Sequence, residues 1–303
     1  MKPLDLFLDS RDRRAVLCIV AETRGSCPGR VGFKMLVPPE GACTGSVGGG
    51  SMEFRVITLA REMLAAGERK PRLVPFDHTG SAEPENRSGM ICSGSQKIVL
   101  IPSHSTGLKL EGKQGLRVNI TGLSLLDLPP EVPEISYSED SWEYTEVIKP
   151  PLTVYIFGGG HCSLALTPVL NSLDLRVVVI DDREHVWTMA ENGSAWKKIV
   201  HSYDLVSKLV PDESNALVVI MTASHTGDAT VLRQMLPKNL KYLGMMASRA
   251  TSKHILGEMK KLGFSEEIID TVHTPIGIPI SSQTPAEIAV SVAAEIVKVL
   301  NRK

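Results

Sequence analysis

Residues 152–183 read LTVYIFGGGHCSLALTPVLNSLDLRVVVIDDR, and this stretch predicts the fold of the second half of the chain. The apolar, β-branched run at 153–157 is typical of a buried parallel strand, and three glycines follow it directly. Leucines at helical spacing come next, and a second apolar run at 176–180 ends in two aspartates. Strand, glycine turn, helix, strand and terminal carboxylate together indicate a dinucleotide-binding βαβ unit.

Two interpretations of this glycine turn stay open. Gly158 and Gly160 are in place, but Ser163 stands where the dinucleotide fingerprint has its third glycine. Pro168 falls inside the predicted helix and removes a backbone donor, so we expect a kink or an irregular turn there. The stretch predicts either a phosphate-bearing ligand at the helix N-terminus or an α/β unit with a glycine turn and no nucleotide.

An acidic residue ends the second strand of the unit. Asp181 lies 21 positions after Gly160, about where an acid that binds a ribose belongs. Asp181 argues against a 2′-phosphate, whereas Arg183 beside it is suited to accept one, so NAD and NADP both remain possible.

Strands and helices continue to alternate after this unit. Strands are expected at about 197–201, 215–221 and 241–246, and helices at about 228–236, 251–263 and 285–300. This alternation predicts a Rossmann-like, doubly wound parallel sheet.

The first half of the chain has a different pattern. Strands are expected at 15–23, 33–37, 71–76 and 97–101, with a helix over 52–66 that Ser51 caps and Gly67 ends. We therefore expect an α/β protein with an N-terminal mixed-sheet domain at 1–104, a connecting segment at 105–150 and a C-terminal Rossmann-like domain at 151–303.

Composition excludes several classes of protein. The 303 residues include 33 basic and 34 acidic side chains, so no electrostatic argument favours nucleic acid or an anionic membrane as a partner. No apolar run is long enough for a transmembrane helix. The five cysteines are irregularly spaced without a CxxC pair, which fits free thiols in a reducing cytoplasm. A homodimer is expected on general frequency alone.

Polar side chains follow several predicted strands of the second domain. The candidates are His161, His225, Asp228 and Arg249. Because open α/β sheets bind ligands at the carboxyl ends of their strands, we expect these residues to converge there with Asp181. Asp228 is also expected to cap the following helix.

The first domain has its own glycine-rich loop, at 45–50, directly before a predicted helix. Its free N–H groups can receive an anion such as a phosphate, which we favour over a passive turn. Cys92 precedes a strand, and its pattern fits a reactive thiol or a buried inert one equally. Cys27 lies between two arginines that would favour its thiolate, so which of these cysteines is reactive stays open.

Taken together, these motifs resemble one family along nearly the whole chain. The matching pieces in the first domain are Gly25–Pro28 with Gly32 and Met35, then Gly45–Glu53 and Cys92–Gly94. Those in the second are Phe157–His161, Ile180–Arg183, Gly244–Arg249, Pro275–Gly277 and Thr284–Ser291. The chain resembles the xanthine dehydrogenase accessory proteins, the XdhC/CoxI family.

The resemblance implies a cytoplasmic maturation factor, more a cofactor chaperone than a catalyst. Such a protein binds the molybdenum cofactor (molybdopterin), holds it for sulfuration and delivers it to a xanthine dehydrogenase-type molybdenum hydroxylase, with a cysteine desulfurase as a further partner. The cofactor-binding residues it implies are Gly45, Gly48, Gly49, Gly50, Glu53, Cys92, Gly158, Gly160, His161, Asp181, Arg183, His225, Asp228 and Arg249. No metal ligand is assigned.

Two other functions compete with this one. An NAD(P)-dependent oxidoreductase would use Gly158, Gly160 and Asp181 for its cofactor, with His161 or His225 as acid or base. It would leave the motifs of the first domain unexplained. An interaction scaffold would retain the glycine turns without a ligand.

Overall fold

The computed structural model describes residues 3–9, 14–77, 94–103, 114–128, 130–148, 152–212 and 215–302. The chain divides into two compact units, Met1–Lys149 and Pro150–Lys303, each with its own hydrophobic clusters. Within the described ranges, no helix has both the length and the apolar character needed to cross a bilayer.

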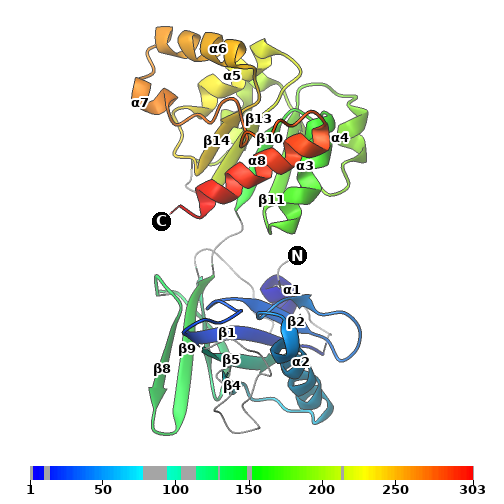
Figure 1. Cartoon of the computed structure of the whole chain (residues 1–303), viewed down its shortest axis with the longest axis vertical. Coiled ribbons are helices and arrows are strands. Elements are labelled where there is room, and N and C mark those ends of the chain that lie inside the picture. The colour runs from blue at the N-terminus through cyan, green and yellow to red at the C-terminus, as the bar shows by residue number, and fades with distance from the viewer. Residues whose placement is uncertain are drawn as a thin grey trace. The chain divides into compact units, whose positions relative to one another are not determined.

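A five-stranded sheet forms the centre of the first unit (Figure 1). Its order is β3-β2-β1-β5-β4, with β1 (Val16–Arg24), β2 (Lys34–Val37), β3 (Thr44–Gly45), β4 (Arg72–Asp77) and β5 (Ser95–Pro102). Residues 16–21 of the central strand are all buried, because both faces of the sheet are covered. We expected a mixed sheet here, and the described pairings are antiparallel.

Helix α2 (Gly50–Ala65) covers one face of this sheet. It buries Met52, Val56, Ala60 and Met63, whose spacing of three or four residues makes one apolar face. The helix begins earlier than expected: Gly49, with φ 79°, is the N-cap, and Ser51 lies inside the first turn. A left-handed N-cap glycine replaces the serine cap that the sequence indicated.

A second sheet and the short helix α1 (Pro3–Asp9) contribute to the cluster on the other face. This sheet has the order β7-β6-β9-β8, with β6 (Gln114–Asn119), β7 (Gly122–Leu126), β8 (Glu134–Ser138) and β9 (Ser141–Ile148). These strands occupy the segment in which we expected a connection. Their alternation is weak because neither β7 nor β8 has a buried side chain, so the pattern resembles a polar linker.

The second unit has the predicted doubly wound parallel sheet. Its order is β12-β11-β10-β13-β14, with β10 (Thr153–Phe157), β11 (Arg176–Asp181), β12 (Lys197–Val200), β13 (Ala216–Ile220) and β14 (Tyr242–Met245). All its described pairings are parallel, and the order reverses between β10 and β13. The confirmed topology makes the carboxyl ends of β10 and β13 the expected place for a ligand.

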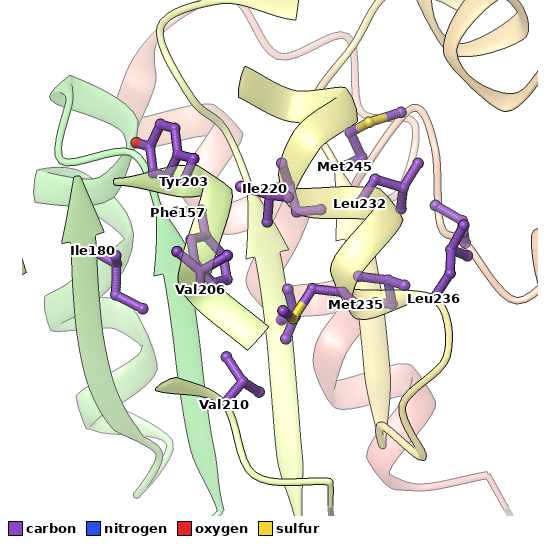
Figure 2. Close-up of a cluster of buried hydrophobic side chains, with 14 of the residues drawn as sticks. Phe157, Ile180, Tyr203, Val206, Val210, Ile220, Leu232, Met235, Leu236 and Met245 are labelled. Atoms are coloured by element: carbon purple, nitrogen blue, oxygen red, sulfur yellow. The ribbon is translucent and has the colours of Figure 1, made fainter. Parts of the chain in front are cut away.

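Helices cover both faces of this sheet (Figure 1). On one face, α3 (His161–Ser172) packs with α8 (Pro285–Leu300) through Leu166, Leu170 and Val292. On the other are η1 (Tyr203–Leu209), α5 (His225–Met235), α6 (Arg249–Lys261) and α7 (Glu266–Ile269). Figure 2 shows part of the cluster on this second face. Helix α3 continues across Pro168.

Candidate functional site

The glycine turn after β10 passes unusually close to the end of β13. Gly158 has φ 112°, and a Cβ added there would lie 2.1 Å from the Met221 carbonyl oxygen. The Gly158 N–H donates to the carbonyl oxygen of Ile180, at 2.8 Å. Glycine is therefore required here by both backbone conformation and space. The turn ends at Gly160, the N-cap of α3, which has no side chain to satisfy the first N–H groups.

Asp181 is buried at the end of β11 and faces this turn. Its Oδ2 accepts a hydrogen bond from Gly159 N, at 2.7 Å. Arg183 donates from its backbone N at 3.0 Å, and from Nε and Nη2 at 2.9 Å each. Burial raises the pKa of Asp181, but these hydrogen bonds outweigh it and hold the pKa below its ordinary value. Both oxygens are thus already engaged within the protein, and ribose binding by Asp181 stays a prediction.

A short helix that the sequence did not indicate lies beside the glycine turn. It is α4 (Trp187–Glu191), and the Trp187 ring meets the His161 ring edge to face, with centroids 5.2 Å apart. The Thr188 hydroxyl donates to the carbonyl oxygen of Gly159. A five-residue helix has too few turns to show a period, so only the tryptophan after the acidic strand end was a signal.

A second polar group follows β13. Asp228 is buried in the first turns of α5, and its Oδ1 accepts from Thr222 N at 2.9 Å and from Thr222 Oγ1 at 2.7 Å. Burial raises the pKa of Asp228 despite these bonds. The prediction that Asp228 caps α5 was wrong, because the Ser224 side chain is the N-cap. The exposed His225 lies with Nδ1 3.9 Å from Asp228 Oδ2.

Arg249 is exposed after β14, as the first residue of α6, with Ser248 as N-cap. His161 and His225 are likewise the first residues of α3 and α5. The three side chains therefore share the carboxyl edge of the sheet. The His161 side chain contacts Trp187, whereas the His225 side chain contacts Asp228. Their convergence on one ligand stays a prediction.

In the first unit, the glycine loop at 45–50 encloses a carboxylate of its own chain. Glu53 Oε2 accepts hydrogen bonds from Ser46 Oγ at 2.5 Å, Val47 N at 2.9 Å and Gly49 N at 3.1 Å. Burial raises the pKa of Glu53, and these bonds more than compensate, so the pKa falls below its ordinary value. The donors that we expected to receive an external anion are thus shared with an internal one.

Close packing joins this loop to the neighbouring loop at 24–30. A Cβ on Gly48 would lie 2.8 Å from Gly29 N, and one on Gly29 would lie 2.4 Å from the Val47 carbonyl oxygen. Cys27 Sγ lies 3.0 Å from the Ser95 carbonyl oxygen. Cys92 lies outside the described residues. Whether either thiol is reactive therefore stays open.

Metal ligation has no support in the described part of the chain. There, no three or more His, Cys, Asp or Glu side chains gather closely enough to hold a metal ion. The candidate residues consist mainly of N–H donors, imidazoles and guanidinium groups, which suit an anionic ligand.

Two family models match the chain. The XdhC Rossmann domain matches residues 154–296, and the XdhC and CoxI family matches residues 8–77. Together these ranges cover more than half of the sequence.

Three bacterial proteins are similar over most of the chain. An uncharacterized protein of Escherichia coli, YqeB, is 25% identical over 93% of the chain, which spans only 43% of that protein. A probable xanthine dehydrogenase subunit of Bacillus subtilis is 22% identical, with 99% of this chain and 97% of that protein covered. The molybdenum cofactor insertion chaperone PaoD of Escherichia coli is 23% identical, with 94% and 83% covered.

A solved structure shares the fold. The crystal structure of a xanthine dehydrogenase from Bacillus halodurans superposes with a TM-score of 0.77 at 22% identity. The match covers 100% of this chain and 97% of that one.

Proposed function

Because the chain belongs to the XdhC and CoxI family, we propose that it is a maturation factor that binds the molybdenum cofactor and delivers it to a xanthine dehydrogenase-type molybdenum hydroxylase. The names of two relatives, a molybdenum cofactor insertion chaperone and a probable xanthine dehydrogenase subunit, support this proposal. Its role is that of a carrier that holds the cofactor for sulfuration.

One feature of the second unit carries the proposal. The helices that follow β10, β13 and β14 begin with His161, His225 and Arg249. The Arg249 guanidinium at the N-terminus of α6 opposes the helix dipole, at a cost of about 0.3–1 kcal/mol, and an anion bound there would interact favourably with both the guanidinium and the dipole. The imidazoles of His161 and His225 add N–H donors. This arrangement at the ligand-binding edge of a doubly wound sheet suits a phosphate-bearing ligand.

The chemistry of these donors fits the cofactor's phosphate. Backbone N–H groups at the start of α3, where Gly160 leaves them uncapped by a side chain, would bind its oxygens. Arg249 and His225 would add charge-assisted hydrogen bonds. When bound, the cofactor supplies the molybdenum centre that the client enzyme uses, and the residues of this chain hold and orient it.

The first unit would support this carrier role. The loop at 45–50, with Glu53, and Cys92 are proposed to contact the cofactor. A cysteine desulfurase as sulfur donor, a homodimeric state and a cytoplasmic location complete the proposal.

Delivery to a client enzyme is the direct test. The full-length chain is loaded anaerobically with molybdenum cofactor, separated from unbound cofactor by gel filtration and added to a cofactor-free xanthine dehydrogenase-type enzyme. We expect enzyme activity to appear with the wild-type chain and to be largely lost with the triple variant His161→Ala, His225→Ala, Arg249→Ala. Lys241→Ala is the matched control, because Lys241 is exposed at the opposite end of β14.

Two results would contradict the proposal. One is a client that gains no activity from the loaded chain. The other is tight binding of NAD(H) with hydride transfer and no retention of the pterin, which would favour an oxidoreductase.

A further inference from the structure

Trp187 is a large apolar side chain exposed beside the glycine turn. The residue is 57% exposed, although it belongs to a helix that packs into the unit. Its ring meets His161, the first residue of α3, edge to face. An edge-to-face contact uses only part of an indole surface, so much of this ring is open to a ligand.

The backbone that carries Trp187 is anchored by the buried residues that follow it in α4. The next two residues, Thr188 and Met189, are buried. The Thr188 hydroxyl donates to the carbonyl oxygen of Gly159, and a Cβ on Gly159 would lie 2.8 Å from Met189 Cβ. At the end of α4, Asn192 Nδ2 donates to Thr167 Oγ1 of α3, at 2.9 Å. The position of Trp187 is thus fixed relative to the glycine turn and α3.

A second exposed tryptophan in the same unit provides a contrast. Trp196 is 60% exposed, but the guanidinium of Arg176 lies over its ring, 4.3 Å from the centroid. This contact covers a ring face by cation–π interaction. The two tryptophans are similarly exposed. They differ in the partner of the ring, which is His161 for Trp187 and Arg176 for Trp196, and only the helix of Trp187 is bonded to the glycine turn through Thr188.

Two buried polar atoms, one in α3 and one at the end of α4, also lack partners. Ser163 Oγ, in the first turn of α3, and Asn192 Oδ1 have no hydrogen-bond partner among the described residues. Both residues are nearly or fully buried. Unpaired buried groups are costly, and water or a ligand that bridges to them would remove the cost.

We propose that Trp187 is a stacking platform for the planar heterocycle of a ligand whose phosphate binds at the start of α3. This inference rests on the proposed function for the phosphate position and names the ligand class: a phosphorylated pterin or a nucleotide. An indole face binds any such ring, because stacking does not depend on its hydrogen-bonding edge. Trp187 is thus the residue that selects a ring-bearing phosphate over a simple one.

The test compares ligands with and without a ring. The probes are dihydroneopterin monophosphate, AMP and ribose 5-phosphate, titrated calorimetrically into the full-length chain. Trp187→Ala should weaken binding of the two ring-bearing probes by about 5- to 150-fold and leave ribose 5-phosphate unchanged. The matched control, Trp196→Ala, should bind all three like the wild type.

Fluorescence gives an independent readout. The chain has three tryptophans, so the variant Trp142→Phe, Trp196→Phe reports on Trp187 alone. The ring-bearing probes should quench this emission, whereas ribose 5-phosphate should not.

The possible failures are distinguishable. Equal affinities for the ring-bearing probes in the wild type and Trp187→Ala overturn the platform but leave cofactor delivery intact. Binding of AMP that depends on Trp187, without cofactor delivery, supports the platform and overturns the carrier role. No binding of either ring-bearing probe by the wild-type chain overturns both.

Discussion

Asp181→Ala is expected to destabilise the second unit, because the carboxylate holds the glycine turn in place. The change leaves the N–H of Gly159 buried without its charged acceptor, which costs about 1.5–3 kcal/mol. Loss of the ion pair with Arg183, whose side chain is 49% exposed, adds at most about 1 kcal/mol. The free energy of unfolding should therefore fall by about 1.5–4 kcal/mol.

Urea unfolding followed by tryptophan fluorescence measures this effect. In a Trp142→Phe background the two remaining tryptophans, Trp187 and Trp196, both belong to the second unit, so the signal reports on that unit alone. Asp182→Ala is the matched control, because Asp182 is exposed next to Asp181 and should change stability by less than about 0.5 kcal/mol. Equal stabilities of the Asp181 and Asp182 variants would refute the view that this carboxylate organises the turn.

Three further predictions concern other contacts. Glu53→Gln removes the negative charge that accepts the hydrogen bonds of the loop at 45–50. The first unit should lose about 1–2 kcal/mol of unfolding free energy, and its melting temperature should fall by roughly 2–8 °C. An unchanged calorimetric transition would show that the loop does not need the charge. Gly158→Ala should cost about 3 kcal/mol or more in urea unfolding, since its Cβ would meet a carbonyl oxygen at 2.1 Å, whereas Gly160→Ala, with nothing within 4 Å, should cost far less; similar costs would contradict the close approach. The Tyr137 hydroxyl helps hold the pKa of Glu22 at about 2. Ionised Glu22 therefore stabilises the folded state fully above the ordinary pKa of 4.5, and this stabilisation is lost as the pH falls from 4.5 toward 2. Tyr137→Phe should therefore flatten the loss of stability across this window in an acid titration followed by circular dichroism, and an unchanged slope would count against the coupling.

The fold of the second unit was predictable because its strands are continuous apolar runs and its main helices have apolar residues at helical spacing. The apolar run at β13 has no exposed position, and the helix α8 carries a capping box of Thr284 and Glu287. Signals of this kind are local and do not depend on distant partners.

The sequence suggested only short strands or a hairpin at 123–128 within a connecting segment, and the four-stranded sheet was not predicted because its burial is decided by distant contacts. From the sequence, Glu146 would be expected at the solvent-exposed surface, yet it is buried. It forms an ion pair with Lys34 of β2, 112 positions away in the sequence, with an N–O distance of 2.9 Å. Tyr144 donates to the same carboxylate at 3.0 Å. No local pattern indicates that a charged side chain will face inward.

The candidate site was predictable in its position but not in its internal bonding. The sequence correctly indicated that His161, His225 and Arg249 follow strands of one parallel sheet. It did not indicate that Asp181 and Glu53 would be engaged by their own loops, because side-chain direction depends on the turn conformation. The approach of Trp187 to His161 likewise depends on a tertiary contact between α4 and α3.

Retention of the pterin by single variants tests the central claim most directly, namely that the cofactor's phosphate binds at the carboxyl edge of the second unit's sheet. Each loaded chain is passed through gel filtration, and the pterin that elutes with it is oxidised and measured by fluorescence. We predict that Arg249→Ala loses most of the retained pterin while Lys241→Ala, at the other end of β14, retains as much as the wild type. Equal retention by these two variants would contradict the claim.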